Sequence, residues 1–78
     1  MYSANYAFVL ENGAARYGSK GSPRIEEVWE QVNYSLEREN NDEAVVYARV
    51  VIFKNREEKL KTLELIGMES IKTYLNKL

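Results

Sequence analysis

The chain has 78 residues, a net charge of −1 from 11 basic and 12 acidic side chains, and neither cysteine nor histidine. These absences exclude disulfide bonds, zinc sites that need Cys or His, and nucleophiles that depend on a histidine base. A chain of this length forms one small domain, so we expect a single α+β domain over residues 1–78 that binds no metal or cofactor and is not an enzyme.

The location of the protein is predicted from what the sequence lacks. The opening segment MYSANYAFVL has no basic n-region of the kind found in signal peptides. No apolar run approaches the roughly 20 residues that cross a bilayer, and the absence of cysteine fits a reducing compartment. We therefore expect a cytoplasmic protein without a membrane partner.

The first predicted element is a β-hairpin over residues 6–19. Asn12-Gly13 is the preferred pair for a two-residue type I′ turn, because both positions need φ > 0. Such a turn pairs Phe8 with Tyr17 and places an apolar, aromatic set on one face: Tyr6, Phe8, Leu10, Ala15 and Tyr17. If residues 14–19 form a loop instead, the fold reduces to β-α-β-α with two strands.

A helix is predicted over residues 23–39, after the flexible loop 18–23. Ser22 is placed to cap it, and Pro23 suits its first turn. Its apolar residues recur at helical spacing on one face: Ile25, Val28, Trp29, Val32 and Leu36.

Residues 44–54 are β-branched and aromatic, so they predict a strand. Asn55 and Glu58 then resemble a capping box and predict a second helix striped by Leu60, Leu63, Gly67, Ile71, Tyr74, Leu75 and Leu78. The predicted order is β-β-α-β-α, with a three-stranded sheet and both helices packed on one face. The predicted inward layer is Phe8, Leu10, Tyr17, Val46, Val50, Ile52, Trp29, Val32, Leu36, Leu63 and Ile71.

The face of the sheet opposite the helices is the first candidate site. The third strand would present Val45, Tyr47, Arg49, Val51 and Phe53 there, and the hairpin would add Val9. A contiguous patch of this kind is uncommon on a monomer, and an arginine among aromatic side chains suits an interface. We therefore predict a protein–protein interface, most simply that of a homodimer; the alternative is that a helix or tail covers the face.

The second candidate is a site for an anion. Arg16, Lys20, Ser22 and Arg24 surround the start of the first helix, where free amides favour phosphate or carboxylate. The spacing of Gly13 and Gly18 resembles a phosphate-binding P-loop, but Ser19 precedes Lys20, which reverses the order that such a loop requires. The alternative function is therefore a binder of nucleic acid or of a phosphate or nucleotide-type anion, using the basic loop 16–24 and the sheet face.

The sequence contains two weaker patterns. Tyr47, Arg49, Phe53 and Arg16 offer rings and cations of the kind on which RNA-recognition sheets rely, although the small net charge disfavours a dedicated nucleic-acid binder. An acidic stripe on the first helix, Glu26, Glu30 and Glu37, is typical of a solvated helix face.

Overall fold

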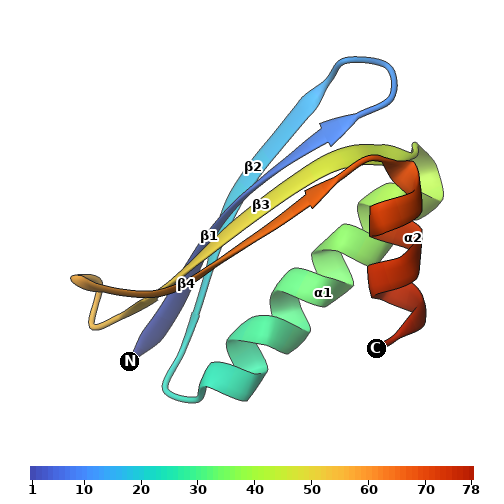
Figure 1. Cartoon of the computed structure of the whole chain (residues 1–78). Helices are drawn as coiled ribbons and strands as arrows, with labels where there is room; N and C mark the ends of the chain where they lie inside the picture. The colour runs from blue at the N-terminus through green and yellow to red at the C-terminus, as the bar shows by residue number, and fades with distance from the viewer.

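The computed structural model describes residues 1–78 as two layers, a four-stranded antiparallel sheet and two helices that pack on the same face of it (Figure 1). The elements are β1 (Tyr2–Leu10), β2 (Ala15–Ser22), α1 (Ile25–Asp42), β3 (Val45–Lys54), β4 (Glu58–Ile66) and α2 (Met68–Asn76). The strand order across the sheet is β2-β1-β3-β4. The α+β class is confirmed, but the sheet has four strands instead of three and the element order is β-β-α-β-β-α.

The first turn contains one residue more than predicted. Gly13 has a φ of 90°, as the prediction requires. However, the Gly13 amide donates to the Leu10 carbonyl at 2.9 Å, and the Leu10 amide donates to the Ala14 carbonyl at 2.8 Å. This pattern is a type I turn followed by a glycine in the left-handed region, which is the common three-residue hairpin loop. The side chain of Asn12 accepts a hydrogen bond from the Ala14 amide at 2.9 Å, so Asn12 stabilises the turn without needing a positive φ.

The longer loop changes the face to which each β2 side chain points. Phe8 pairs with Arg16 instead of Tyr17, and Ala7 pairs with Tyr17. Because side chains alternate along a strand, a slip of one residue moves every side chain to the other face. The prediction that Tyr17 faces the helices was therefore wrong: Tyr17 lies on the helix-free face and is 79% exposed. Arg16 lies on the helix face, where it pairs with Glu39 of α1 at 3.2 Å.

A bulge near the start of β3 changes which valine is buried. Val9 pairs with Tyr47 and Leu10 pairs with Val45, so Val46 has no partner on β1. An extra residue of this kind lets two consecutive side chains break the alternation of the strand. Val45 consequently points toward the helices and is fully buried, whereas Val46 is only half-buried. From residue 47 onward the faces of β3 are as predicted.

The prediction of one long helix after β3 was wrong for residues 55–66, which form a turn and a fourth strand. Asn55 and Arg56 have φ of 54° and 63°, the sign that a type I′ turn needs at both central residues. The Glu57 amide donates to the Lys54 carbonyl at 3.2 Å and closes this turn.

Strand β4 pairs with β3 at an edge of the sheet where no strand was predicted. Leu63 and Leu65 pair with Val50 and Ala48 and lie on the helix face of the sheet. Pairing with β4 satisfies the second row of backbone donors and acceptors of β3, which a helix in this position would leave without partners. Only the last part of the predicted helix is helical, and it begins after Gly67, whose φ is 92°.

The core lies between the sheet and the two helices. It consists of eleven buried residues: Ala4, Phe8, Leu10, Val28, Val32, Leu36, Val45, Ala48, Val50, Ile52 and Ile71. The predicted inward face of α1 is confirmed, because Val28, Val32 and Leu36 are its buried residues. The hydroxyl of Tyr74 in α2 donates to the side chain of Asn33 in α1 at 2.7 Å and joins the two helices.

Candidate binding face

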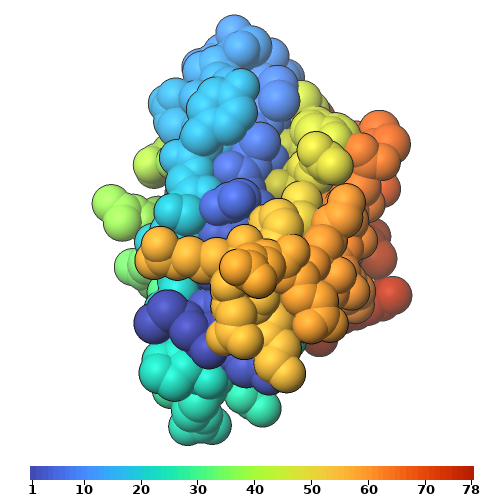
Figure 2. All heavy atoms as spheres, turned by 90° about the vertical axis from the view of Figure 1, so that its left-hand side faces the viewer, coloured from blue at the N-terminus to red at the C-terminus, as the bar shows by residue number.

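The face of the sheet that carries no helix is the candidate site, and we call it the open face. Its side chains form rows across β2, β1, β3 and β4. In that order the rows are Ala15, Val9, Tyr47 and Ile66; Tyr17, Ala7, Arg49 and Glu64; Ser19, Asn5, Val51 and Thr62; and Gly21, Ser3, Phe53 and Lys59. Figure 2 looks onto this face, where β2, β1, β3 and β4 lie side by side and no helix crosses them.

Apolar and aromatic side chains gather in the first three rows of the open face. Tyr17 and Ile66 are 79% and 68% exposed, and Val9, Tyr47 and Val51 are half-buried between them. Strands about 4.8 Å apart with residues about 3.3 Å apart give the whole face an outline of roughly 500 Å². Only part of this outline is apolar. The area of that part is comparable to the apolar patches of a few hundred Å² that often serve as binding sites.

Two opposite charges stand side by side on the open face without forming an ion pair. Arg49 and Glu64 are cross-strand partners, but the ion pairs of the protein involve neither residue. Glu64 instead accepts a hydrogen bond from the Tyr47 hydroxyl at 2.6 Å. This bond raises the pKa of Tyr47; desolvation and the charge of Glu64 act in the same direction, whereas the charge of Arg49 lowers it. The guanidinium of Arg49 therefore keeps its donors free for another molecule.

The structure brings most of the predicted interface residues together. Tyr47, Arg49, Val51 and Phe53 follow one another along β3, and Val9 is the neighbour of Tyr47 on β1. The placement of Val45 on this face was wrong, because the bulge described above moves its side chain into the core.

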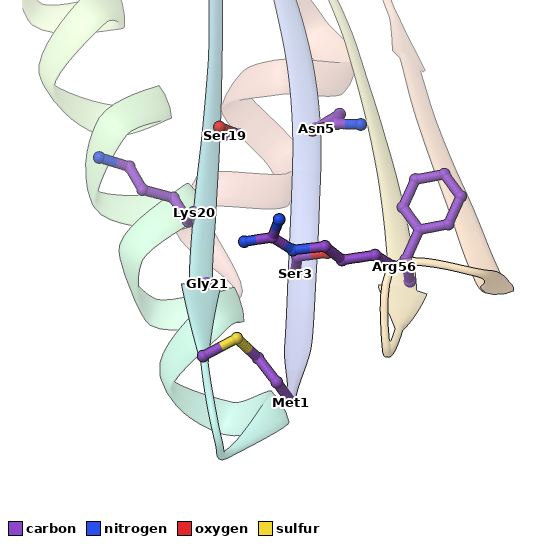
Figure 3. Close-up of a pocket in the computed structure, with 8 residues that line it drawn as sticks. Met1, Ser3, Asn5, Ser19, Lys20, Gly21 and Arg56 are labelled. Carbon is purple, nitrogen blue, oxygen red and sulfur yellow. The ribbon is translucent and has the colours of Figure 1, made fainter.

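Three residues of the predicted anion site lie in β2 and Arg24 lies in the segment before α1, and most of them already have protein partners. Arg16 pairs with an acidic residue of α1. The prediction that Ser22 caps α1 was wrong, because the N-cap residue is Arg24. Ser22 is buried; its hydroxyl donates to Glu27 at 2.8 Å and accepts from the Arg24 amide at 3.2 Å. Arg24 precedes the helix and lies 3.7 Å from the Glu27 carboxylate. Lys20 alone has no ion pair, and in Figure 3 it points away from the open face.

The far end of the open face is hollowed. A cavity of about 460 Å³ is lined by Met1, Ser3, Asn5, Ser19, Lys20, Gly21, Phe53 and Arg56. A second hollow of about 200 Å³ continues toward the apolar rows and shares Asn5 with the first. No acidic side chain lines either hollow. Figure 3 shows the side chain of Arg56 lying across Ser3 toward β2.

Sequence reasoning did not place Tyr17, Glu64, Ile66 or Arg56 at a site. The last three were missed because residues 55–66 were interpreted as part of a helix. The signal that favours a strand is the alternation of polar and apolar residues over Thr62, Leu63, Glu64 and Leu65 after an asparagine suited to a turn. Tyr17 was missed because its face depends on the length of the hairpin loop.

The chain contains no group of three or more His, Cys, Asp or Glu side chains placed to hold a metal ion. Neither helix has the length and apolar character needed to span a membrane. Comparison with protein-family models, with curated proteins and with solved structures finds no match to this chain.

Proposed function

We propose that the protein is a small cytoplasmic binding protein that acts as a homodimer formed through the apolar rows of the open face, and that it acts by binding rather than by catalysis. The observation that carries this proposal is the position of Tyr17 and Ile66, which stand exposed on a sheet face that no element of the chain covers. A second copy of the same face would remove them from water. Each 100 Å² of apolar surface buried in this way contributes about 2.5 kcal/mol.

The charges of the open face favour a second copy as its partner. A two-fold interface must be self-complementary, because residue i of one copy contacts residue j of the other and the reverse. Arg49 has free donors, and Glu64 accepts one bond from Tyr47 and retains further acceptor capacity. A two-fold axis passing between these two residues would set each Arg49 against the partner's Glu64, with apolar side chains around both pairs. Such pairing sets the orientation of a complex more than its affinity.

The size of the open face predicts a weak dimer. Two outlines of roughly 500 Å² cover about 1,000 Å² if the whole open face is buried, and less if only the apolar rows are, which is near or below the lower limit for a specific interface. Association must also offset the loss of rotational and translational freedom. We therefore expect a dissociation constant on the order of 10 μM, so the dimer should be measured at about 100 μM protein.

A charge swap tests this arrangement. Arg49→Glu and Glu64→Arg each place like charges opposite one another in the dimer, so each variant alone should be a monomer. An equimolar mixture restores both attractive pairs and should form a one-to-one heterodimer, detectable by native mass spectrometry. Arg38→Glu changes an exposed charge on α1 and serves as the matched control, with an unchanged mass. A mixture that stays monomeric would refute the pairing of Arg49 with Glu64.

A further inference from the structure

The backbone at Arg56 is unusual. Arg56 has a φ of 63° in the turn between β3 and β4, although the second central position of a type I′ turn strongly prefers glycine. Residues other than glycine are uncommon at positive φ, and asparagine and aspartate tolerate it better than arginine does. Strain of this kind is concentrated at functional sites. The position of the Arg56 side chain therefore points to a binding role.

The side chain of Arg56 lies over a polar hollow and has no partner there. It reaches from the turn across Ser3 toward β2 (Figure 3), and it takes part in none of the ion pairs or side-chain hydrogen bonds of the protein. No carboxylate lines the cavity beneath it. A guanidinium carries five donors in a planar fork that matches the oxygens of a phosphate.

The remaining walls of the cavity suit an aromatic, polar ligand. Ser3, Asn5 and Ser19 provide two hydroxyls and an amide, none of which makes a side-chain hydrogen bond within the protein. Phe53 supplies an aromatic wall, and Gly21 lines the cavity without a side chain. The cavity volume of about 460 Å³ lies within the range of roughly 300–1,000 Å³ that is typical of small-molecule sites.

We propose that this cavity binds a mononucleotide, with Arg56 holding the phosphate and Phe53 stacking against the base. The cavity shares Lys20 with the predicted anion site but centres on Arg56 and Phe53, away from the start of α1. It is formed by one chain and does not require the homodimer, although a dimer that covered the whole open face would close it. A nucleic-acid strand fits less well, because strand binding needs a positively charged groove that follows the backbone. Here the neighbouring hollow has a volume of only about 200 Å³ and contains Arg49 as its one cation.

An NMR titration of the full chain with AMP tests the site. AMP should produce saturable amide shifts confined to residues that line the cavity, with a dissociation constant on the order of 1 mM because the cavity is open to solvent. Inorganic phosphate and adenosine, each titrated alone, should bind more weakly than AMP. If phosphate binds as tightly as AMP, the stacking of the base on Phe53 is refuted. The absence of saturable shifts with AMP would refute the whole proposal.

A variant of Arg56 separates binding from folding. Arg56→Gly removes the guanidinium and relieves the positive φ, so it should raise the melting temperature while weakening AMP binding at least about fivefold. Phe53→Leu should weaken AMP and adenosine but leave phosphate binding unchanged. Lys72→Ala, on the exposed side of α2, is the control and should leave AMP binding unchanged. Unchanged AMP affinity in Arg56→Gly would overturn the proposal, as would a single-stranded oligonucleotide that binds more tightly than AMP with shifts across all four strands.

Discussion

The aromatic ring of Tyr6 lies over Gly18 of the neighbouring strand, in the space that a Cβ at residue 18 would occupy. Tyr6 also stacks on Phe8, with the ring centroids 4.6 Å apart. An aromatic side chain from β1 thus covers a glycine in the edge strand β2. Glycine weakens a strand because it has no side chain to pack, and a cross-strand aromatic ring compensates for this loss.

Gly18→Ala should destabilise the protein by about 1–3 kcal/mol, because the added methyl group overlaps the ring of Tyr6 and forces it off its stack. Gly21→Ala is the matched control, since a Cβ there meets only the Tyr2 carbonyl oxygen at 3.7 Å. Urea unfolding of both variants measures the difference. Equal stability of the two variants would contradict the close approach of Tyr6 and Gly18.

Gly13→Val should lower the free energy of unfolding by about 1–2 kcal/mol, because a β-branched residue is disfavoured at positive φ. No atom lies within 4 Å of a Cβ built on Gly13, so the cost arises from the backbone and not from crowding. Gly13→Asn should cost less, because asparagine tolerates the left-handed region. If valine and asparagine have the same effect in urea unfolding, Gly13 does not occupy the left-handed region in solution.

The pKa of Tyr47 should respond in opposite directions to two neighbouring substitutions. Glu64→Ala removes the hydrogen bond and the negative charge that raise this pKa, so the pKa should fall toward its ordinary value of 10.0. Arg49→Ala removes the positive charge that lowers it, so the pKa should rise further. Titration of the tyrosine ring by NMR measures both shifts. Shifts of the same sign in the two variants would contradict the electrostatic arrangement of these residues.

Tyr74 should make the protein less stable at alkaline pH. Burial raises the pKa of Tyr74 above 10.0. The folded protein therefore favours the neutral hydroxyl. This contribution to stability is complete below the ordinary pKa and is lost as the pH rises through the raised pKa.

The variant Tyr74→Phe tests this pH dependence. At neutral pH it should lose about 0.5–1.5 kcal/mol with the hydrogen bond to Asn33, but its stability should fall less steeply above pH 10. Thermal melts across the alkaline range compare the two proteins. An alkaline slope as steep as that of the wild type would show that ionisation of Tyr74 does not contribute.

Periodicity in the sequence predicts the structure correctly where only one pattern, helical or strand, fits the residues. The spacing of Val28, Val32 and Leu36 predicts the buried face of α1, and alternation predicts the open face of β3 from Tyr47 onward. The leucines of β4 fit a helical stripe as well as a strand, and only the pairing of β4 with β3 decides between them. Predicting β4 as a strand therefore requires knowing that it pairs with β3, and the local sequence pattern does not contain this information.

The sequence predicts most of the candidate site on β3, but it does not decide the placement of the residues next to turns and bulges. Asn12-Gly13 suits both a two-residue and a three-residue loop, and the difference of one residue decides whether Arg16 or Tyr17 faces the helices. In a run of valines, no residue type marks the position of a bulge, so the burial of Val45 could not be predicted. Arg56 was missed because its neighbour Asn55 resembles a helix cap as well as a turn residue.

The central claim is that the open face forms a homodimer, and the solution mass of the chain by sedimentation equilibrium at about 100 μM tests it most directly. Val51→Lys is the interface variant. Thr73→Lys, on the exposed side of α2, is the control. Val51 is half-buried on the open face, so a lysine there adds a charge to the interface without entering the core. The wild type and the control should sediment with an average mass of about 16 kDa, close to twice the chain mass of 9.1 kDa, because about four fifths of the chains are dimeric at this concentration. Val51→Lys should sediment at 9.1 kDa with an unchanged far-UV circular dichroism spectrum. A wild-type protein that sediments at 9.1 kDa under these conditions would contradict the claim that the open face forms a homodimer.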